Sequence, residues 1–188
     1  MGKLIYGMNV SVDGYTVDGQ DEIPSAGPDD ELHQFWNNQV RDVAVSLYGR
    51  KLYELMSAYW PTADQTPDIS PVAAEFARLW RAMPKVVFSK TLESVDWNSR
   101  LERGGVVEVA RKLKAETDGM LDVAGSTLAS SLVKAGLVDE FMVVVTPVAV
   151  GGGTPFFPAL HEWIKLELVE NRTFPSGSVL LRYVAVRD

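Results

Sequence analysis

The sequence predicts an α/β fold whose central sheet is mainly parallel, with an antiparallel hairpin at its C-terminal edge. Apolar runs of strand length alternate with helix-periodic segments along the first 150 residues, as expected when helical crossovers join parallel strands. Near the end of the chain, strand-like runs at residues 165–172 and 179–186 flank a Pro-Ser-Gly sequence, which is a hairpin signal. The length of 188 residues, without a linker or an internal repeat, predicts one domain over residues 1–188.

The first part of the chain carries two predicted strands, each followed by a helix. Residues 3–12 predict the first strand, and an Asp-Gly turn follows it. Residues 14–30 are rich in Gly, Asp, Pro and Ser and predict a long surface loop, a kind of segment that often carries function. A helix is expected to begin at residues 28–31, because Pro and acidic side chains favour a first helical turn. Residues 42–48 read as a buried strand, and Gly49 opens the next helix.

The rest of the chain continues this alternation up to the hairpin. The predicted elements are a polar loop at 61–71, a helix at 72–83, a strand at 85–89, a helix at 108–116, a strand at 120–123, a helix at 126–135 and a strand at 141–150. Pro84 ends the first of these helices, and Gly136 is a good C-cap for the last. The mainly parallel sheet therefore follows from the order of the elements.

The composition excludes several classes of function. The formal net charge of −7 argues against nucleic-acid and membrane-surface binding, because both depend on clustered Lys and Arg. The chain has no cysteine and two histidines, so a thiol nucleophile is excluded and no metal site is expected. No signal peptide and no membrane span of roughly 20 apolar residues is present, so a cytoplasmic protein is expected. The common nucleotide-binding glycine motifs and the G-x-S-x-G elbow are missing, which disfavours phosphoryl transfer and serine hydrolysis.

Three predicted strand ends carry residues suited to binding an anion near a helix N-terminus. They are Gly49, Arg50 and Lys51; Ser89, Lys90 and Thr91; and Gly125, Ser126, Thr127 and Leu128. Each set also has a structural interpretation, with the cations as solvated helix charges and the hydroxyls as helix caps. Because ligands of open α/β sheets lie beyond the carboxyl ends of the strands, the three sets together predict one ligand-binding edge.

The order and spacing of these motifs resemble the dihydrofolate reductases and, more closely, the reductase domain of riboflavin biosynthesis with its stand-alone relatives. The first strand ends in Ser-Val-Asp-Gly, and Gly-Arg-Lys, Val-Val-Phe-Ser-Lys-Thr-Leu and Ala-Gly-Ser-Thr follow in turn. The most specific match is Ala-Gly-Leu-Val-Asp-Glu-Phe at residues 135–141, followed by Gly-Gly-Gly-Thr-Pro-Phe-Phe at 151–157. The likeness spans residues 3–186. It implies a dihydrofolate reductase-like three-layer fold, with helices on both faces of a mixed, mostly parallel sheet.

The resemblance also implies that NADPH lies across the strand ends. The cofactor then carries the redox chemistry, and the protein positions it. By the family pattern, Arg50 and Lys51 beside Gly49 approach the cofactor phosphates. The adenosine ribose and its 2′-phosphate meet Ser89, Lys90 and Thr91, and the pyrophosphate is held by Gly125, Ser126, Thr127 and Leu128. The nicotinamide and the substrate are bordered by Asn9, Ser11 and Gly14.

The catalytic acid is less clearly marked than the cofactor residues. Dihydrofolate reductases carry one buried carboxylate on the first helix, and Asp30 and Glu31 fall near that place, where they also suit the helix dipole. Asp13 is a third candidate, because the riboflavin-type motif keeps an Asp before this Gly, and its alternative role is that of a turn residue. His33 is expected in a cleft wall or on the surface rather than in a proton relay. Ala124 departs from the family pattern, which often has Gly there.

The first functional hypothesis is an NADPH-dependent reductase of a small pterin-, pyrimidinone- or folate-like substrate, similar to dihydrofolate reductase or 5-amino-6-(5-phosphoribosylamino)uracil reductase. The alternatives are a catalytically silent nucleotide- or ligand-binding module on the same fold, and a flavin- or drug-binding relative. The zinc deaminase domain that accompanies some riboflavin reductases is excluded, because its cysteines are missing. The resemblance predicts a homodimer, with residues 142–150 and the terminal hairpin as contact surfaces. Substrate specificity is expected in the loops at 14–30 and 60–71.

Overall fold

An eight-stranded sheet organises the computed structural model, which describes residues 2–27 and 29–187. Its strand order is β5-β4-β3-β6-β1-β7-β10-β9. The strands are β1 (Lys3–Val10), β3 (Val43–Gly49), β4 (Lys85–Phe88), β5 (Ser99–Glu102), β6 (Met120–Ala124), β7 (Glu140–Val145), β9 (Leu166–Thr173) and β10 (Val179–Ala185). The first six of these strands run parallel to one another, whereas β10 runs antiparallel to both β7 and β9. The predicted mixed, mostly parallel sheet with a terminal hairpin is confirmed.

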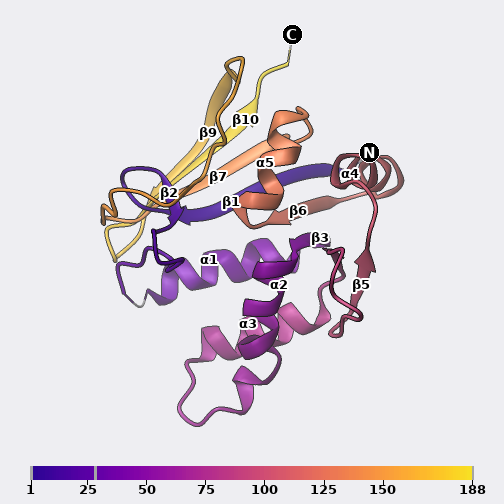
Figure 1. The fold of residues 1–188 in the computed structure, drawn as a ribbon. Coiled ribbons are helices and arrows are strands. Elements are labelled where there is room, and N and C mark those ends of the chain that lie inside the picture. Colours follow the sequence, from indigo (N-terminus) through magenta and orange to yellow (C-terminus); the bar gives the residue numbers. More distant parts are fainter. Residues whose placement is uncertain (1, 28, 188) are drawn as a thin grey trace.

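Helices cover both faces of this sheet (Figure 1). One face carries α1 (Asp30–Arg41), α2 (Arg50–Tyr59) and α3 (Pro71–Ala82), and the other carries α4 (Val106–Glu116) and α5 (Ser126–Lys134). Alternate strand residues divide the core accordingly: Leu4 and Tyr6 of β1 pack toward α5, whereas Ile5 packs with α1. The three-layer prediction is therefore confirmed. None of the helices within the described ranges combines the length and apolar character needed to span a membrane.

The structure differs from the sequence prediction in its short elements. The loop predicted at 14–30 contains β2 (Tyr15–Val17), which pairs antiparallel with β8 (Thr154–Pro155) in a second small sheet. A 3-10 helix, η1 (Trp60–Gln65), occupies part of the loop predicted at 61–71, and β5 was not predicted. β7 ends at Val145 instead of residue 150, because Pro147 has no N–H to continue the ladder. Pro28, part of the predicted helix start, lies outside the described residues.

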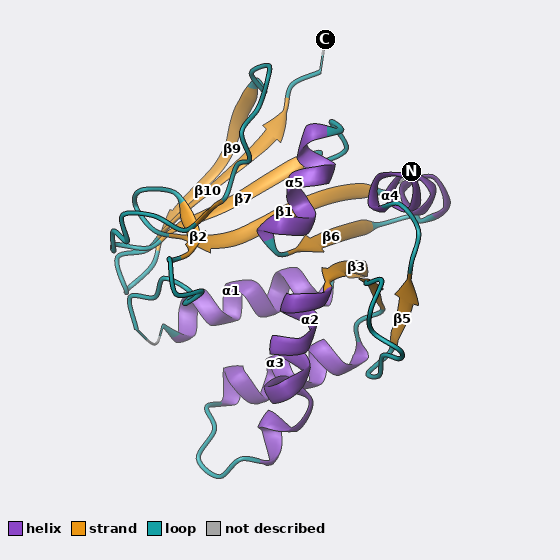
Figure 2. Cartoon of the chain, in the orientation of Figure 1, coloured by secondary structure: helices purple, strands orange, loops and turns teal. Residues whose placement is uncertain are grey.

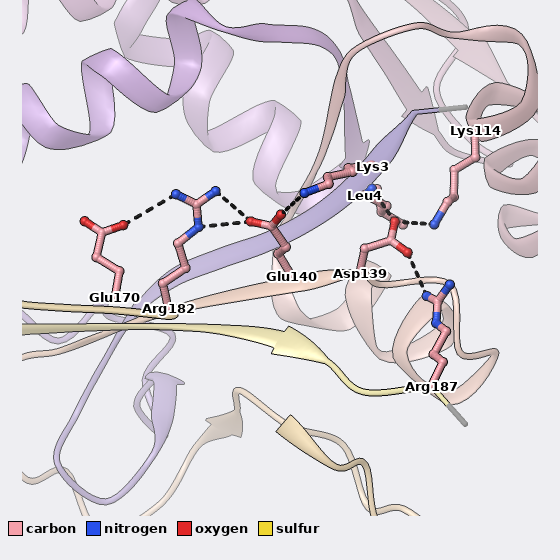
Figure 3. Close-up of polar contacts among 8 residues, drawn as sticks. All are labelled: Lys3, Leu4, Lys114, Asp139, Glu140, Glu170, Arg182 and Arg187. Atoms are coloured by element: carbon pink, nitrogen blue, oxygen red, sulfur yellow. Dashed lines mark hydrogen bonds and ion pairs between the residues drawn. The ribbon is translucent and has the colours of Figure 1, made fainter. Parts of the chain in front are cut away.

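The amino ends of the central strands are joined by ion pairs (Figure 3). Glu140 is buried at the start of β7, where its carboxylate lies 2.7 Å from Lys3 Nζ and 2.6 Å from Arg182 Nη2. Arg182 also reaches Glu170 on β9 at 3.4 Å. Burial acts to raise the pKa of Glu140, but the hydrogen bonds and charges of Lys3 and Arg182 keep it below its ordinary value. This end of the sheet is thus occupied by structural contacts.

The opposite, carboxyl end of the parallel strands is bordered by loops and helix starts. In Figure 2 long loops gather near the arrowhead of β1, around the small β2–β8 sheet. Helices α2 and α5 begin directly after β3 and β6, at Arg50 and Ser126. The predicted ligand-binding edge is therefore built from short strand-to-helix turns.

Candidate functional site

A cleft of about 540 Å³ runs along the carboxyl ends of the parallel strands. It brings together most of the predicted cofactor residues: Gly49, Arg50, Lys51, Ser89, Lys90, Gly125, Ser126, Thr127 and Leu128. Thr91 lies beside it and accepts a hydrogen bond from Arg50 Nη1 at 2.7 Å. The three strand ends that the sequence singled out therefore meet in one cavity.

The helices that begin at this cleft have open N-termini. α2, α4 and α5 start after Gly49, Gly105 and Gly125, and no side chain caps any of the three. By contrast, α1 is capped by the Asp29 carboxylate and α3 by the Ser70 hydroxyl. An uncapped first turn leaves backbone N–H groups without intrahelical partners, and the helix dipole makes that end attractive to an anion. The first turns of α2, α4 and α5 therefore offer unpaired backbone N–H donors at the cleft.

Gly125 is required at the start of α5 by its backbone conformation. Its φ of +94° is one that residues with a side chain rarely adopt, and an added Cβ would lie 3.2 Å from Leu52 Cδ2. Ala124, before it, continues β6 in an ordinary conformation, and every described peptide bond is trans. A glycine here lets the backbone of the turn face the cleft directly.

The cations of α2 are held by neighbouring side chains in the structure. Arg50 forms an i,i+4 ion pair with Glu54 at 3.0 Å in addition to its bond to Thr91. Lys51 pairs with Asp21 at 2.6 Å, which joins the loop after β2 to the start of α2 in the lining of the cleft. Both pairs are largely exposed, and exposed pairs contribute little to stability. The two cations can therefore exchange these partners for a bound anion at small cost.

The loop after β4 carries a cluster that the sequence revealed only in part. Ser89 Oγ accepts hydrogen bonds from the N–H groups of Thr91 and Leu92, at 3.2 Å and 3.0 Å, so this hydroxyl shapes the turn. Arg103 lines the cleft from the end of β5 and donates to the carbonyls of Lys90 and Leu92. Sequence reasoning missed Arg103 because the polar β5 was not recognised as a strand. The signal available was an Arg-Gly-Gly sequence before the helical period of α4.

The small β2–β8 sheet closes one side of the cleft. Thr16 is fully buried, and its hydroxyl bridges to Ser126 Oγ and to the carbonyl of Thr154, both at 3.0 Å. Thr16, Val17 and Thr154 line the cleft. No sequence signal marked them, since their role depends on contacts more than 100 residues apart in the chain.

A second cavity, of about 280 Å³, lies beside α1 and the ends of β1 and β7. Its described lining includes Asn9, Leu32, His33, Trp36, Thr146, Ser176 and Ser178. Asn9 Oδ1 accepts a hydrogen bond from Trp36 Nε1 at 3.0 Å, which fixes the amide against α1. Met8 lines the large cleft and the adjacent Asn9 lines the second cavity, so the two cavities flank the end of β1.

Ser11 and Gly14 lie in the turn that follows β1, outside the lining of both cavities. Ser11 is fully buried, and its hydroxyl accepts from Tyr15 N at 3.0 Å. Gly14 adopts a φ of +88°, donates to Ser11 O and accepts from Phe156 N. Both residues direct the chain from β1 into β2, which carries the cleft residues Thr16 and Val17.

Two of the three predicted acids, Asp13 and Glu31, have polar partners in the structure. Asp13 accepts from Gly151 N at 2.7 Å and from Val150 N at 3.2 Å, and hydrogen bonds from the Ser11 hydroxyl and these amides lower its pKa. Glu31 pairs with Arg172 of β9 at 2.6 Å.

Asp30, at the start of α1, is exposed. None of these three acids is among the described residues that line either cavity. Their catalytic role stays a prediction that no cavity contact supports. Through the hydrogen bonds that it accepts from Gly151 N and Val150 N, Asp13 joins the turn after β1 to the glycine-rich loop before β8.

A carboxyl with a raised pKa lies elsewhere, on β6. Burial raises the pKa of Asp122 to about 6, although the Ser46 hydroxyl donates to it at 2.7 Å and acts in the opposite direction. On the same face of the sheet lies Tyr48, whose pKa burial also raises and whose hydroxyl accepts a hydrogen bond from Trp80 Nε1 at 3.0 Å. Asp122 is not among the lining residues of the two cavities. Within the described residues, no group of three or more acidic or histidine side chains could hold a metal ion.

Comparison with known proteins gives matches along nearly the whole chain. Residues 2–180 match the family model described as the RibD C-terminal domain. The uncharacterized protein YyaP of Bacillus subtilis (strain 168) is 30% identical over 182 residues, which cover 96% of this chain and 94% of YyaP.

Solved structures show the same fold at low sequence identity. Dihydrofolate reductase from Enterococcus faecalis, solved in complex with NADP(H), superposes with a TM-score of 0.66 at 14% identity over 99% of this chain and 98% of its own. The diaminohydroxyphosphoribosylaminopyrimidine deaminase/5-amino-6-(5-phosphoribosylamino)uracil reductase of Thermotoga maritima gives a TM-score of 0.68 at 13% identity. The match covers 98% of this chain but only 57% of that two-activity protein.

Proposed function

The chain belongs to the RibD C-terminal domain family, and from this membership we propose that it is an NADPH-dependent reductase of a small heteroaromatic substrate. The observation that carries the proposal is the cleft along the strand ends, where three uncapped helix N-termini and the cations Arg50, Lys51, Lys90 and Arg103 come together. Such a surface suits an extended ligand with several negative charges. A dinucleotide phosphate has that chemistry.

The residues of the cleft fit this cofactor in their donor chemistry. The open first turns of α2 and α5 would hold the pyrophosphate, with Gly125 allowing the backbone to approach it. Arg50 and Lys90 would bind the 2′-phosphate of the adenosine ribose. The acidic residues in the lining, Asp21 and Glu102, already accept bonds from Lys51 and from the Gly104 amide. Their charge is therefore already partly compensated.

The chain's own contribution to catalysis would be positioning and the exclusion of water. A bound reduced nicotinamide supplies a hydride for an electron-poor carbon. Thr16 would hold the Ser126 side of the cleft in place through its two hydrogen bonds, and the β2–β8 sheet would cover the reacting groups. The substrate would enter the second cavity, beside Asn9 and Trp36, across the end of β1 from the cofactor.

The direct test is a thermal unfolding experiment with NADPH and with NADH. At one hundred times the dissociation constant, a ligand stabilises the folded state by about 2.7 kcal/mol. We expect a rise in Tm with NADPH and a much smaller one with NADH. Stabilisation by NADPH without turnover of any pterin, dihydrofolate or pyrimidinone would favour the alternative, a binding module without catalysis. A Tm unchanged by either nucleotide would contradict the proposal.

Arg50→Ala is expected to weaken NADPH binding more than NADH binding. Arg50 lies in the cleft with its guanidinium already directed to Thr91, next to the predicted 2′-phosphate position. Loss of a hydrogen bond to a charged group costs about 1.5–3 kcal/mol, so the dissociation constant for NADPH should rise about 10- to 100-fold. Isothermal titration calorimetry measures both constants. Arg78→Ala, on the exposed side of α3, is the control, and equal losses for the two nucleotides in Arg50→Ala would refute this assignment.

We also propose that a second copy of the chain is its protein partner, through the terminal hairpin. Leu168 and Val169 of the outermost strand β9, together with Leu160 and Val186, are exposed, and Trp163 is 99% exposed. Large apolar side chains exposed on and near an edge strand favour an interaction surface there, because an edge strand can pair with another chain. The predicted contact at 142–150 is less suitable, since β7 lies between β1 and β10 and has no free edge.

The double variant Trp163→Ser/Leu168→Lys should shift a dimer to a monomer in sedimentation velocity at matched concentration. The variant removes the most exposed aromatic ring and places a charge on the sheet edge, which disfavours edge pairing. Tyr59→Ser, at the end of α2, is the matched control because Tyr59 is 52% exposed on another part of the surface. A monomeric wild-type protein, or a double variant that stays dimeric, would contradict the proposed partner surface.

A further inference from the structure

The second cavity contains few groups that can exchange a proton. Among its described lining residues, Asp29 and His33 are the ones that titrate, and the others are hydroxyl, amide, small or apolar side chains. No Lys or Arg is among these lining residues. A substrate bound there would therefore meet one carboxyl group and one imidazole.

Asp29 is unsuited to giving up a proton, because hydrogen bonds hold it as a carboxylate. It caps α1 by accepting from the N–H groups of Glu31 and Leu32, both at 3.0 Å, and it accepts from Ser176 N at 2.9 Å. Burial acts to raise its pKa, but these bonds and the Ser176 hydroxyl leave the pKa below its ordinary value. Asp29 is thus occupied as the helix cap.

His33, one turn into α1, is half-buried in the wall of this cavity. Its imidazole lies edge-on to the rings of Trp60 and Phe76, with centroids 5.9 Å and 5.7 Å away. No hydrogen bond within the described residues occupies its ring nitrogens. The charged groups that act on it are Asp30 of α1 and Glu75 of α3. The aromatic rings fix the orientation of the imidazole and leave its nitrogens available to a ligand.

We propose that His33 is a catalytic residue that donates the proton to the substrate nitrogen during reduction, an inference that rests on the proposed reductase function. Reduction of a C=N bond places a hydride on carbon, and the π electrons move to nitrogen, where a proton completes an N–H bond. The hydride comes from the reduced nicotinamide cofactor, which becomes oxidised. The proton comes from the His33 imidazolium, which becomes neutral imidazole and is recharged by solvent. The substrate class is an imine-containing heterocycle without a phosphate in this cavity, since no cation lines it.

This role has a defined pH dependence. Burial lowers the pKa of His33 from its ordinary value of 6.5, and the nearby charges of Asp30 and Glu75 act in the opposite direction without cancelling that shift. The imidazolium form is therefore the minor form at neutral pH. Turnover should rise as the pH falls toward the pKa of His33 and level off below it.

The experiment measures kcat/KM between about pH 5 and about pH 8, with NADPH as reductant and 7,8-dihydropterin or dihydrofolate as the imine probe. His33→Gln should lower kcat/KM about 100-fold or more and remove the rise toward acid pH, because a general acid contributes about 10²- to 10⁴-fold. In His33→Ala, added imidazole should restore part of the rate. His161→Gln, which replaces the other histidine of the chain, is the matched control and should leave the profile unchanged.

A second readout does not require turnover. In the untagged His161→Gln protein the only histidine NMR signal comes from His33, and dihydropterin or dihydrofolate should shift its titration midpoint. If His33→Gln keeps the wild-type Tm and its kcat/KM still rises toward acid pH, the proton-donor role of His33 is overturned and the reductase proposal is not. If NADPH raises the Tm but neither probe moves the His33 signal, the inference is overturned while the cofactor proposal stands. If NADPH does not bind, both are overturned.

Discussion

Asp139→Asn should lower the free energy of unfolding by about 3–5 kcal/mol, because it leaves the charge of Lys114 buried without its counter-ion. The Lys114 side chain is 7% exposed, and its ammonium pairs with the Asp139 carboxylate (Figure 3). The same carboxylate accepts from Leu4 N at 2.8 Å and pairs with Arg187 at 2.8 Å. One side chain therefore joins β1, α4 and the C-terminal segment. Urea denaturation measures the change.

A double variant separates the loss of charge pairing from general damage. In Lys114→Met/Asp139→Asn the buried ammonium is also gone, and replacement of a buried ion pair by an apolar group is often neutral. Most of the lost stability should therefore return. Glu167→Gln, on the exposed edge strand β9, should change the free energy of unfolding by no more than about 0.5 kcal/mol. A single variant that loses under about 1 kcal/mol, or a double variant as unstable as the single one, would show that this pair is not a major stabilising contact.

The sequence predicts the positions of those strands and helices whose apolar pattern is strong. β1, β3, β4 and β6 and the helices α3, α4 and α5 lie within a few residues of their predicted ranges, because each has buried residues at the period of its structure. β5 reads Ser-Arg-Leu-Glu and pairs with one neighbour only, so it buries too little to show a pattern. β2 and β8 are shorter still and depend on each other across the chain.

In the candidate site, too, the residues with a local sequence signal could be predicted and those that depend on tertiary contacts could not. The cleft residues at Gly49, Ser89 and Gly125 could be predicted, since each lies at the end of an apolar strand or directly after it, where the turn chemistry is local. The second cavity could not, because it forms where α1, β1 and the hairpin turn at Ser176 meet in space. The sequence predicts His33 in a cleft wall or on the surface rather than in a proton relay. The structure places it in the wall of the second cavity. The proposed role as proton donor departs from that prediction, because it rests on the lack of a competing donor among the described lining residues, which is a tertiary property.

Gly153→Ala should lower the free energy of unfolding by about 2–5 kcal/mol, the sum of left-handed backbone strain and overpacking. Gly153 has a φ of +135°, and an added Cβ would lie 2.0 Å from the carbonyl oxygen of Val17 and 2.8 Å from Asp18 Cα. These are backbone atoms, so the clash can be relieved only if β2 moves away from β8. Thr16 would then lose its position between Ser126 and Thr154, and the wall of the large cleft would open.

The adjacent glycine provides the matched control for this prediction. An added Cβ at Gly152 meets no atom within 4 Å, and its φ lies outside the range that favours glycine, so Gly152→Ala should keep the wild-type Tm. NADPH titration by calorimetry should give a weaker dissociation constant for Gly153→Ala and an unchanged one for Gly152→Ala. Equal Tm and equal affinity in the two variants would mean that the β2–β8 pair neither stabilises the fold nor forms the cofactor wall. If Gly153→Ala loses stability but keeps its NADPH affinity, the β2–β8 pair stabilises the fold but does not form part of the cofactor-binding wall.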